Sequence, residues 1–404
     1  MNKKVMALAV AGALAAPAAA LAQVQIGGSI TLFYYQHDPD NDSIARTGDI
    51  METSEPEIYV RGEDKLGGGN SAWFQCTSSL DGLVNGTSPA SNAGWCGRNS
   101  GIGFRGGFGN VFFGNWDQPQ KLVFNRGRGW FGGTNAFTGG SAVLLNGGSA
   151  SGSTNAQNTN TFFRRQANSL NYHSPNWGGF SFQAAFSAAN ESTGNPDSGP
   201  LDPRMASLGG HFATGPLYVG LGFELHQDYN PAAQAVGTGA GQYSGGDDTT
   251  VTLVVGLRFG GFNVRAMYNA SEYEVGSATA GGKNNLEVDG FGLFADWNIS
   301  GPHTLRAQYV MLNDTSGTST VPVGSYVQPV GTNCGLSGTA SCGSDTGGDL
   351  AAFFYSYALS KRTEISAGIS AMGNDDNARF SKGKSATTFG GTQTNYGLVV
   401  RHRF

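Results

Sequence analysis

The stretch that decides the fold reads DTTVTLVVGLRF over residues 248–259, continues through two glycines, and then reads FNVRAMYNASEYEV over residues 262–275. Val251 and Leu253 flank Thr252, and apolar residues recur at every second position. A period of two is that of an extended strand with one apolar face and one polar face. Two such segments joined by two glycines predict a β-hairpin.

This unit of an alternating segment and a turn recurs along the chain. Each segment is close to the length of a tilted membrane strand, which takes about 9–11 residues. Sixteen segments can be read, and they cover about 23–37, 54–66, 69–81, 97–106, 109–117, 164–175, 179–190, 203–214, 216–228, 248–259, 262–275, 286–298, 303–314, 347–359, 363–374 and 393–404.

The joins between these segments alternate between short and long. Tight turns include Gly260-Gly261 and Thr214-Gly215-Pro216, whereas polar stretches rich in glycine, serine and asparagine fill 118–163, 229–247 and 315–346. Short turns on one side and long loops on the other are typical of outer-membrane barrels. The sequence therefore predicts an all-β fold, a 16-stranded antiparallel transmembrane β-barrel whose last strand pairs with its first. Because sixteen strands enclose more space than side chains fill, we expect a water-filled channel.

The amino-terminal segment has the order of a secretory signal peptide. Met1-Asn2-Lys3-Lys4 is followed by an apolar run over residues 5–16 and by the small-residue site Ala20-Leu21-Ala22. The run is short and alanine-rich for a transmembrane anchor. We therefore expect residues 1–22 to be removed on export and residues 23–404 to form one barrel domain.

The composition excludes several classes of protein. Of 404 residues, 64 are glycine, 11% are aromatic and 13% are charged, and no stretch of about 18 apolar residues follows the amino-terminal segment. A helical membrane protein is thereby excluded. The formal net charge is −5 and the basic residues form no run. Nucleic-acid binding therefore has little support.

An enzyme is the main alternative from another class. The six histidines are scattered, and the sequence contains no nucleophile elbow and no metal-binding histidine helix. We expect no catalytic residue, no metal and no cofactor. A structural barrel with a blocked lumen would need a plug domain, and none is visible. A substrate-specific channel would need an aromatic or basic track, which is not obvious, and the choice between general and specific transport stays open.

Four cysteines fall into two near pairs, Cys76 with Cys96 and Cys334 with Cys342. An even number of cysteines in an exported chain favours disulfides, and no histidine stands at ligand spacing from either pair. We expect two local disulfides that staple loops, in preference to a metal site.

Four stretches resemble the Gram-negative general porins, most closely the type common in β-proteobacteria. They are VRGEDKLGGG at 60–69, residues 98–114 with their glycine spacing, RQANSLNYHSP at 165–175 and the ending RHRF at 401–404. The resemblance covers essentially the whole chain after residue 22. It implies a homotrimer in the cell outer membrane, surrounded by lipid and lipopolysaccharide, with a long third loop folded into the barrel. It also implies a passive channel for small hydrophilic solutes and ions.

The end of the chain resembles the signal that the outer-membrane assembly machinery reads. Its residues stand at every second position and finish on an aromatic carboxyl terminus. They are Tyr396, Leu398, Val400, His402 and Phe404.

The third long loop, residues 118–163, would form the pore constriction by the same resemblance. We expect Asp117, Lys121, Arg126 and Arg128 at this constriction, and a solvated surface loop is the alternative. In the family, acidic loop residues often face arginines on the wall. This chain departs from that pattern, because five basic residues and one acid lie from position 117 to position 166.

Alternation also assigns charged residues to the lumen face of the wall. An arginine or lysine facing lipid near the membrane midplane costs about 2–4 kcal/mol, which disfavours the other face. The expected wall residues are Glu57, Arg61, Glu224, Arg258, Arg265, Asp296 and Arg306. With the loop included, basic residues outnumber acidic ones, and a ring of basic residues favours anions. The sequence therefore predicts a mild preference for anions among the permeating ions.

Overall fold

The structure is a computed structural model of the chain. It describes residues 24–39, 48–80, 94–132, 137–146, 162–187, 204–227, 247–276, 283–318, 331–334, 340–342, 344–378, 380 and 389–404. The expected signal peptide, residues 1–22, lies outside the described residues.

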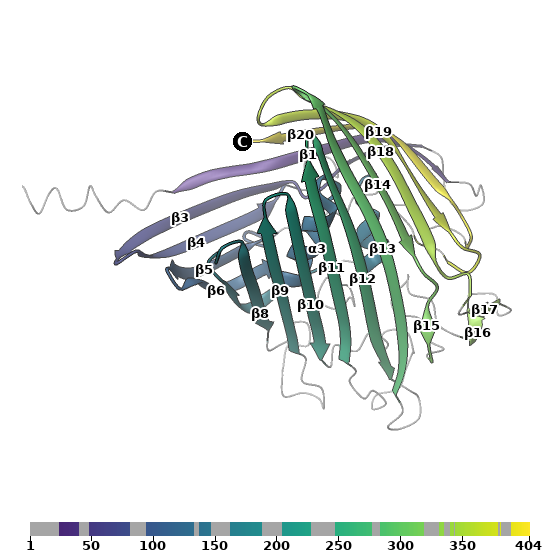
Figure 1. Cartoon of the computed structure of the whole chain (residues 1–404), viewed down its shortest axis with the longest axis horizontal. Coiled ribbons are helices and arrows are strands. Elements are labelled where there is room, and N and C mark those ends of the chain that lie inside the picture. The colour runs from purple at the N-terminus through teal and green to yellow at the C-terminus, as the bar shows by residue number, and fades with distance from the viewer. Residues whose placement is uncertain are drawn as a thin grey trace, which may run out of the picture.

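Sixteen strands form the wall of a barrel in which every neighbouring pair is antiparallel (Figure 1). Their bounds are β1 (Gln25–Pro39), β3 (Glu57–Gly67), β4 (Asn70–Ser79), β5 (Ser100–Gly106), β6 (Gly109–Asp117), β7 (Arg165–His173), β8 (Phe180–Ser187), β9 (Arg204–Thr214), β10 (Leu217–Gln227), β11 (Asp247–Phe259), β12 (Phe262–Gly276), β13 (Lys283–Ser300), β14 (His303–Leu312), β18 (Gly348–Ala358), β19 (Thr363–Asn374) and β20 (Gln393–Arg403). From β1 the pairing follows the chain to β20, which pairs with β1 and places Leu32 opposite Val400. The prediction of a closed 16-stranded antiparallel barrel is confirmed.

One wall strand is broken beside the lumen. β2 (Gly48–Thr53) and β3 both pair with β1, and residues Ser54, Glu55 and Pro56 separate them. Proline has no N–H to donate to a strand ladder, and Glu55 has a left-handed φ of 47°. The strand predicted at 54–66 therefore begins earlier in the structure, and the break falls at its expected start.

Three further short strands lie near the loop end of the barrel. β15 (Ser316–Gly317) pairs with β13 beyond the end of β14. β16 (Gly331–Cys334) and β17 (Ala340–Cys342) pair with each other and form a separate hairpin. All three fall in a predicted polar loop, because strands this short have no readable alternation.

The hairpin of residues 247–276 forms as predicted, and its two faces differ. Phe259 lies opposite Phe262 across the glycine turn. Val251 and Leu253 are 39% and 40% exposed on the outside of β11, whereas Thr252 is buried on the lumen side. Lipid solvates apolar side chains, so an apolar outer face and a polar inner face are stable in a membrane barrel.

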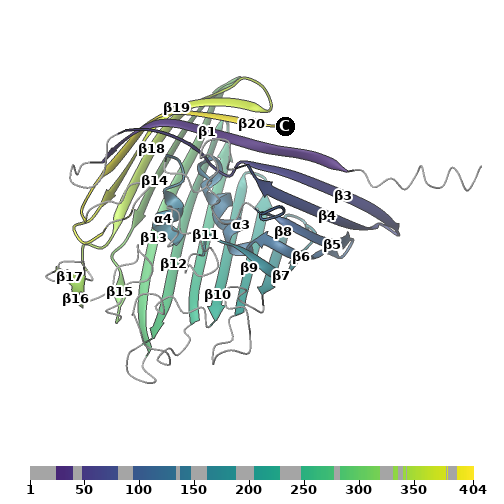
Figure 2. The same cartoon turned by 180° about the vertical axis from the view of Figure 1, so that it is seen from behind.

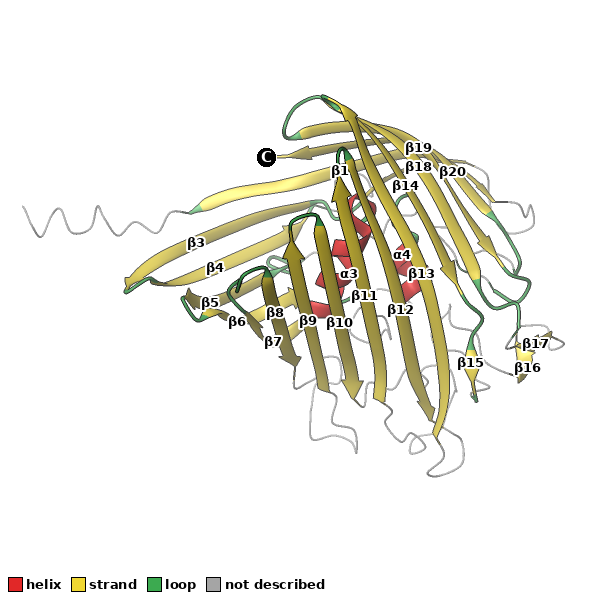
Figure 3. Cartoon of the chain, in the orientation of Figure 1, coloured by secondary structure: helices red, strands yellow, loops and turns green. Residues whose placement is uncertain are grey.

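The third long connection folds into the barrel and contains the helices. α3 (Pro119–Arg128), the 3-10 turn η2 (Gly129–Phe131) and α4 (Ser141–Asn146) lie on the inner side of the strands (Figures 2 and 3). Proline suits the first turn of α3 because its missing N–H would have no partner there. α3 packs mainly on β9 to β12, and α4 packs on β12, β13, β14 and β18. The predicted inward fold of the third loop is confirmed. In the part of the chain that the structure describes, no helix is long and apolar enough to cross a membrane.

Glycines allow α3 to lie directly against the wall. A Cβ at Gly222 of β10 would lie 3.2 Å from the Cα of Gln120, and a Cβ at Gly209 of β9 would lie 2.9 Å from the carbonyl oxygen of Pro119. The helix backbone thus approaches the strand backbone more closely than larger side chains would permit. The start of the loop is therefore seated directly against β9 and β10.

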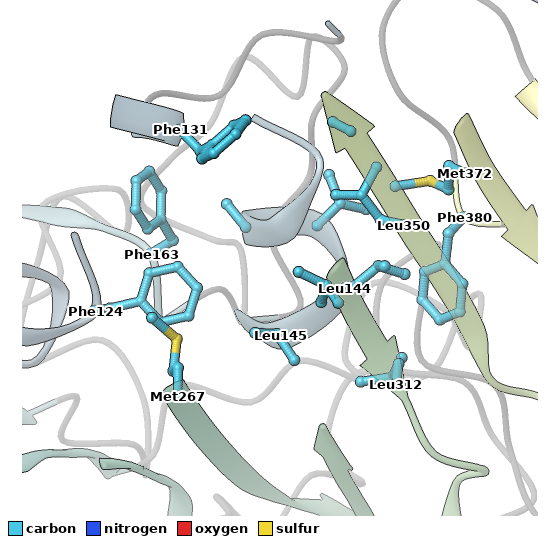
Figure 4. Packing of buried hydrophobic residues seen from close by; sticks show 14 of the residues in the cluster. Phe124, Phe131, Leu144, Leu145, Phe163, Met267, Leu312, Leu350, Met372 and Phe380 are labelled. Carbon is cyan, nitrogen blue, oxygen red and sulfur yellow. The ribbon is translucent and has the colours of Figure 1, made fainter. Parts of the chain in front are cut away.

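An apolar cluster between the third loop and the wall holds both helices. Leu144 and Leu145 of α4 are buried, and Leu144 lies toward Leu350 of β18, while Phe124 of α3 lies beside Met267 of β12 (Figure 4). Burying a side chain of this size contributes about 1.5–3 kcal/mol. The interior is thus partly filled by the loop and by apolar wall residues, so the water-filled part is narrower than the strand number alone suggests.

Candidate functional site

A cavity of about 760 Å³ lies in the lumen beside the third loop. Gly215 and Gly260 of the tight turns line it, which places it at the turn end of the barrel. We call it the arginine cavity, because four guanidinium groups and one carboxylate line it. The charged residues are Arg126 of α3, Arg258 of β11, Arg265 of β12, Arg306 of β14 and Asp296 of β13.

Ion pairs fix two of these arginines and leave the other two available. Asp296 Oδ2 lies 2.7 Å from Arg265 Nη2, and Asp296 Oδ1 lies 3.4 Å from Arg306 Nε. Arg265 Nε also donates to the carbonyl oxygen of Gly127 at 2.8 Å, which ties α3 to the wall. Among the described residues, neither Arg126 nor Arg258 takes part in an ion pair. Their positive charges therefore act on the cavity without a neutralising carboxylate beside them.

A second cavity of about 290 Å³ lies on the other side of the loop tip. We call it the mixed-charge pocket, because two arginines and two glutamates line it. Asn125, Gly129 and Trp130 line both cavities, so the loop tip separates them. The other residues lining the mixed-charge pocket are Ser29, Thr31, Phe33, Ser54, Glu55, Glu57, Gly132, Arg401 and Arg403.

Trp130 is the central residue of the loop tip, and it was not among the residues predicted for the site. Its Nε1 donates to Glu364 Oε1 of β19 at 2.7 Å. The guanidinium carbons of Arg306 and Arg401 lie 4.7 and 5.4 Å from its ring centroid, within the range of cation–π attraction. The sequence contained a signal for this residue. A tryptophan that follows RGRG in a polar loop is seldom fully exposed to solvent, so its side chain is expected to contact other residues.

Two basic loop residues do not face the lumen cavities as expected. Arg128 is fully buried, and its guanidinium donates to Ser141 Oγ at 2.8 Å and to the carbonyl oxygen of Phe131 at 2.8 Å. Burial lowers the pKa of Arg128 to about 9, and burial also lowers the pKa of Lys121. Both side chains hold the loop together instead of lining the path, because the loop folds back over them. Of the three expected basic constriction residues, Arg126 is the one that lines a cavity.

Asp117 lies at the base of the third loop and forms ion pairs with one residue at each end of it. Lys121 Nζ lies 2.6 Å from Asp117 Oδ1, and Arg165 Nη2 lies 3.2 Å from the same oxygen. Asn99 Nδ2 donates to Asp117 Oδ2 at 3.0 Å. The carboxylate therefore connects the first and last residues of the loop with the preceding loop.

The remaining predicted wall residues lie at three different places. Glu57 lines the mixed-charge pocket and pairs with Arg98 at 3.2 Å. Arg61 is exposed, and its Nε donates to Gln25 Oε1 at 2.9 Å near the turn end. Glu224 is fully buried next to His226, at 2.8 Å, and lines neither cavity. Alternation predicts the inner face for Glu224, but it contains no information on whether other residues bury the side chain there.

One of the two expected disulfides is present. Cys76 of β4 is bonded to Cys96, which lies 20 residues later in the second long connection. The backbones of Cys334 and Cys342 lie on the paired strands β16 and β17. Their side chains lie outside the described residues. In the described ranges, no group of three or more histidine, cysteine, aspartate or glutamate side chains could hold a metal ion.

The comparisons with known proteins agree with this barrel. The family model described as Gram-negative porin matches residues 7–377. The chain belongs to the Gram-negative porin family. The porin is 29% identical over 204 residues to the major outer membrane protein P.IB of Neisseria gonorrhoeae, a match over 49% of this chain and 51% of that protein. It thus spans about half the length of this curated relative. Family and relative together indicate the outer membrane.

Two solved structures resemble the whole porin fold. An anion-selective porin from Comamonas acidovorans matches with a TM-score of 0.67 and 18% identity over 95% of this chain and 100% of that chain. The trimer form of OmpT of Vibrio cholerae matches with a TM-score of 0.61 and 12% identity over 95% of this chain and 99% of that chain. At these identities the likeness concerns the fold.

Proposed function

We propose that the porin is a passive, water-filled channel for small hydrophilic solutes and ions, with a mild preference for anions. The observation that supports it is the charge of the lumen beside the loop tip. Six arginines and three carboxylates line the two cavities, and they are Arg126, Arg258, Arg265, Arg306, Arg401 and Arg403 against Asp296, Glu55 and Glu57.

A lumen with this excess of positive charge attracts anions and repels cations. Field lines concentrate in a narrow aqueous path between low-dielectric walls, which strengthens the effect beyond that of the same charges on an open surface. Because the loop tip narrows the lumen where these arginines gather, permeating ions pass within a Debye length, about 8 Å at physiological salt, of several of them. The name of one relative, an anion-selective porin, agrees with the proposal.

The proposed constriction differs in composition from the one expected from the sequence. Arg126, Gly129 and Trp130 form its loop side, and Arg306 and Arg401 face them from the wall. Asp117, Lys121 and Arg128 support it from within the loop and at its base. In this proposal Asp117, Lys121 and Arg128 set the position of the loop tip. The residues of the tip and of the facing wall contact the solute.

The test is the reversal potential of the purified protein in a planar bilayer under a potassium chloride gradient. We expect the sign that corresponds to chloride passage. A potential of the opposite sign would contradict the anion preference and leave the channel intact. Absence of conductance from folded protein would favour a second candidate function, a structural barrel with a blocked lumen. The observation that favours this candidate is the apolar packing between α4 and β18 inside the barrel.

The proposed assembly is a homotrimer in lipid and lipopolysaccharide, inserted by the outer-membrane assembly machinery through the terminal strand. OmpT of Vibrio cholerae, a structural relative, has a trimer form. Tyr396, Leu398 and Val400 present exposed apolar side chains outward from β20, and so does Phe404. Conductance steps in multiples of three would support the trimer. Deletion of Phe404 should lower the yield of heat-modifiable protein in outer membranes, and an unchanged yield would contradict the role of this signal.

A further inference from the structure

The mixed-charge pocket has an order of charges that general anion attraction does not explain. In one row across the wall, Arg403 of β20 lies opposite Ser29 of β1, and Ser29 lies opposite Glu57 of β3. In the next row toward the loop end, Arg401 lies opposite Thr31, whose carbonyl oxygen accepts a hydrogen bond from the N–H of Ser54 at 3.2 Å. The first row therefore contains an arginine, a hydroxyl group and a glutamate, and the second contains an arginine, a hydroxyl group and Ser54, which directly precedes Glu55.

The positive and negative edges are a short distance apart. One strand, β1, separates the arginines from the glutamates, so their backbones lie roughly 10 Å from each other across two strand spacings. A pocket of 290 Å³ has room for roughly ten water molecules at about 30 Å³ each. These dimensions suit a solute of a few heavy atoms with opposite charges at its two ends.

The charges on both edges are available to a solute. Among the described residues, neither Arg401 nor Arg403 takes part in an ion pair. Among the described residues, the ion-pair partner of both Glu55 and Glu57 is Arg98, at 3.8 and 3.2 Å, and the two glutamate side chains remain 40% and 33% exposed. The acidic edge therefore carries one negative charge beyond that of Arg98, and the basic edge carries two positive charges, with Glu364 opposite Arg401 on the neighbouring strand β19.

The acidic edge depends on an unusual backbone. Glu55 has a left-handed φ of 47° and stands between β2 and β3, immediately before Pro56. Non-glycine residues adopt this conformation rarely, and such residues concentrate at functional sites. The break removes Glu55 from the strand ladder, and its carboxylate lines the pocket that Phe33 and Trp130 bound on the apolar side.

From these observations we infer that the mixed-charge pocket is a binding site for small zwitterions of the amino-acid class. The solute carboxylate binds Arg401 and Arg403, its ammonium group binds Glu55 and Glu57, and the hydroxyl groups of Ser29 and Thr31 lie between them. The inference rests on the proposed channel, since a solute reaches the pocket through the lumen. It deepens that proposal, because a purely anion-attracting lumen would not distinguish a zwitterion from a neutral solute.

The experiment compares four solutes with the same three-carbon skeleton in the reconstituted trimer. β-Alanine is the zwitterion, propionate the anion, propylamine the cation and propionamide the neutral analogue. The readout is the concentration that halves the chloride current through single channels. We expect this concentration to be at least fivefold lower for β-alanine than for propionamide. Equal values for the two solutes would overturn the inference.

Charge-neutralising variants then identify the site. Glu55→Gln with Glu57→Gln is nearly isosteric and should raise the half-blocking concentration of β-alanine at least fivefold, without weakening the effect of propionate. Arg401→Gln with Arg403→Gln should raise the half-blocking concentrations of both β-alanine and propionate. The matched control is Arg258→Gln, which removes a charge from the arginine cavity and should leave the preference for β-alanine unchanged. An equal loss in that control would assign the effect to the general field of the lumen.

A second measurement separates this inference from the proposed function. Titration calorimetry of β-alanine with the detergent-solubilised trimer measures binding without requiring conductance. Binding without conductance would contradict the proposed channel function and support the zwitterion-binding site. Conductance without any difference in binding between β-alanine and propionamide would support the channel function and overturn the inference that the mixed-charge pocket binds zwitterions. Retained heat-modifiable mobility on gels checks that each variant is folded.

Discussion

Replacing Arg258 by glutamine should reduce the anion preference by an amount that follows from the size of the arginine cavity. Arg258 is exposed in this cavity, and among the described residues it takes part in no ion pair. A sphere of 760 Å³ has a radius of roughly 6 Å. At that distance one unit charge in water contributes about 0.7 kcal/mol to the energy of a permeating ion.

Salt screening reduces this energy in a calculable way. With a Debye length of about 8 Å at 0.15 M salt, roughly 0.3 kcal/mol remains, with opposite signs for chloride and potassium. The chloride-to-potassium permeability ratio should therefore fall about threefold in Arg258→Gln at 0.15 M. At 0.01 M salt, where the Debye length is about 30 Å, it should fall about sevenfold.

The assay is the reversal potential in potassium chloride gradients at both salt levels. Lys361→Gln is the matched control, because Lys361 is exposed at the turn between β18 and β19 and lines neither cavity. A permeability ratio that is unchanged in Arg258→Gln would refute the reasoning. The same change in both variants would refute it too, because the effect would then come from net charge and not from the cavity.

Three further predictions concern stability. Joint replacement of Cys76 and Cys96 by serine should lower the free energy of unfolding by about 3 kcal/mol, because the disulfide closes a loop with a sequence separation of 20; an unchanged urea midpoint in lipid vesicles would contradict this. Leu144→Ala should cost about 2–5 kcal/mol in the same assay, because the side chain is buried, whereas the lipid-facing Leu253→Ala should cost clearly less. Burial, followed by repulsion from Asp314, Asp345 and Asp349, raises the pKa of Asp375, so the stabilising protonated form is lost as pH rises through that pKa. Asp375→Asn should therefore raise the melting temperature at pH 7, and the gain should disappear near pH 3; a gain that grows in acid would contradict the sign.

Strand number, turn positions and barrel closure could be predicted from the sequence because each depends on local pattern. The alternation in residues 248–275 directly determines which side chains meet lipid, since a strand has two faces and only one is apolar. The turns were equally readable, because glycine pairs such as Gly260-Gly261 join strands at fixed geometry. Where the pattern was short, as in β16 and β17, the prediction was wrong.

The proposed constriction follows from the sequence only in outline. Its place in the third loop follows from loop length and family resemblance, but the directions of Arg126 and Arg128 depend on how the loop folds back. Two residues apart in one helix, they end on opposite sides, one lining a cavity and the other fully buried. Trp130 was missed because an isolated pair of aromatic residues, Trp130 and Phe131, has no periodicity. Its importance depends on Arg306 and Arg401, which approach it from distant strands.

The apolar cluster has a consequence for the seam of the barrel. Tyr35 of β1 stacks on Phe137 of the third loop at 5.1 Å, and Phe33 of β1 and Val399 of β20 belong to the same cluster. The seam where the first and last strands join is therefore packed from inside by a segment from the middle of the chain. A loop that stayed outside would leave these seam side chains in water. We therefore expect the inserted loop and the closed seam to stabilise each other, because each buries apolar side chains of the other.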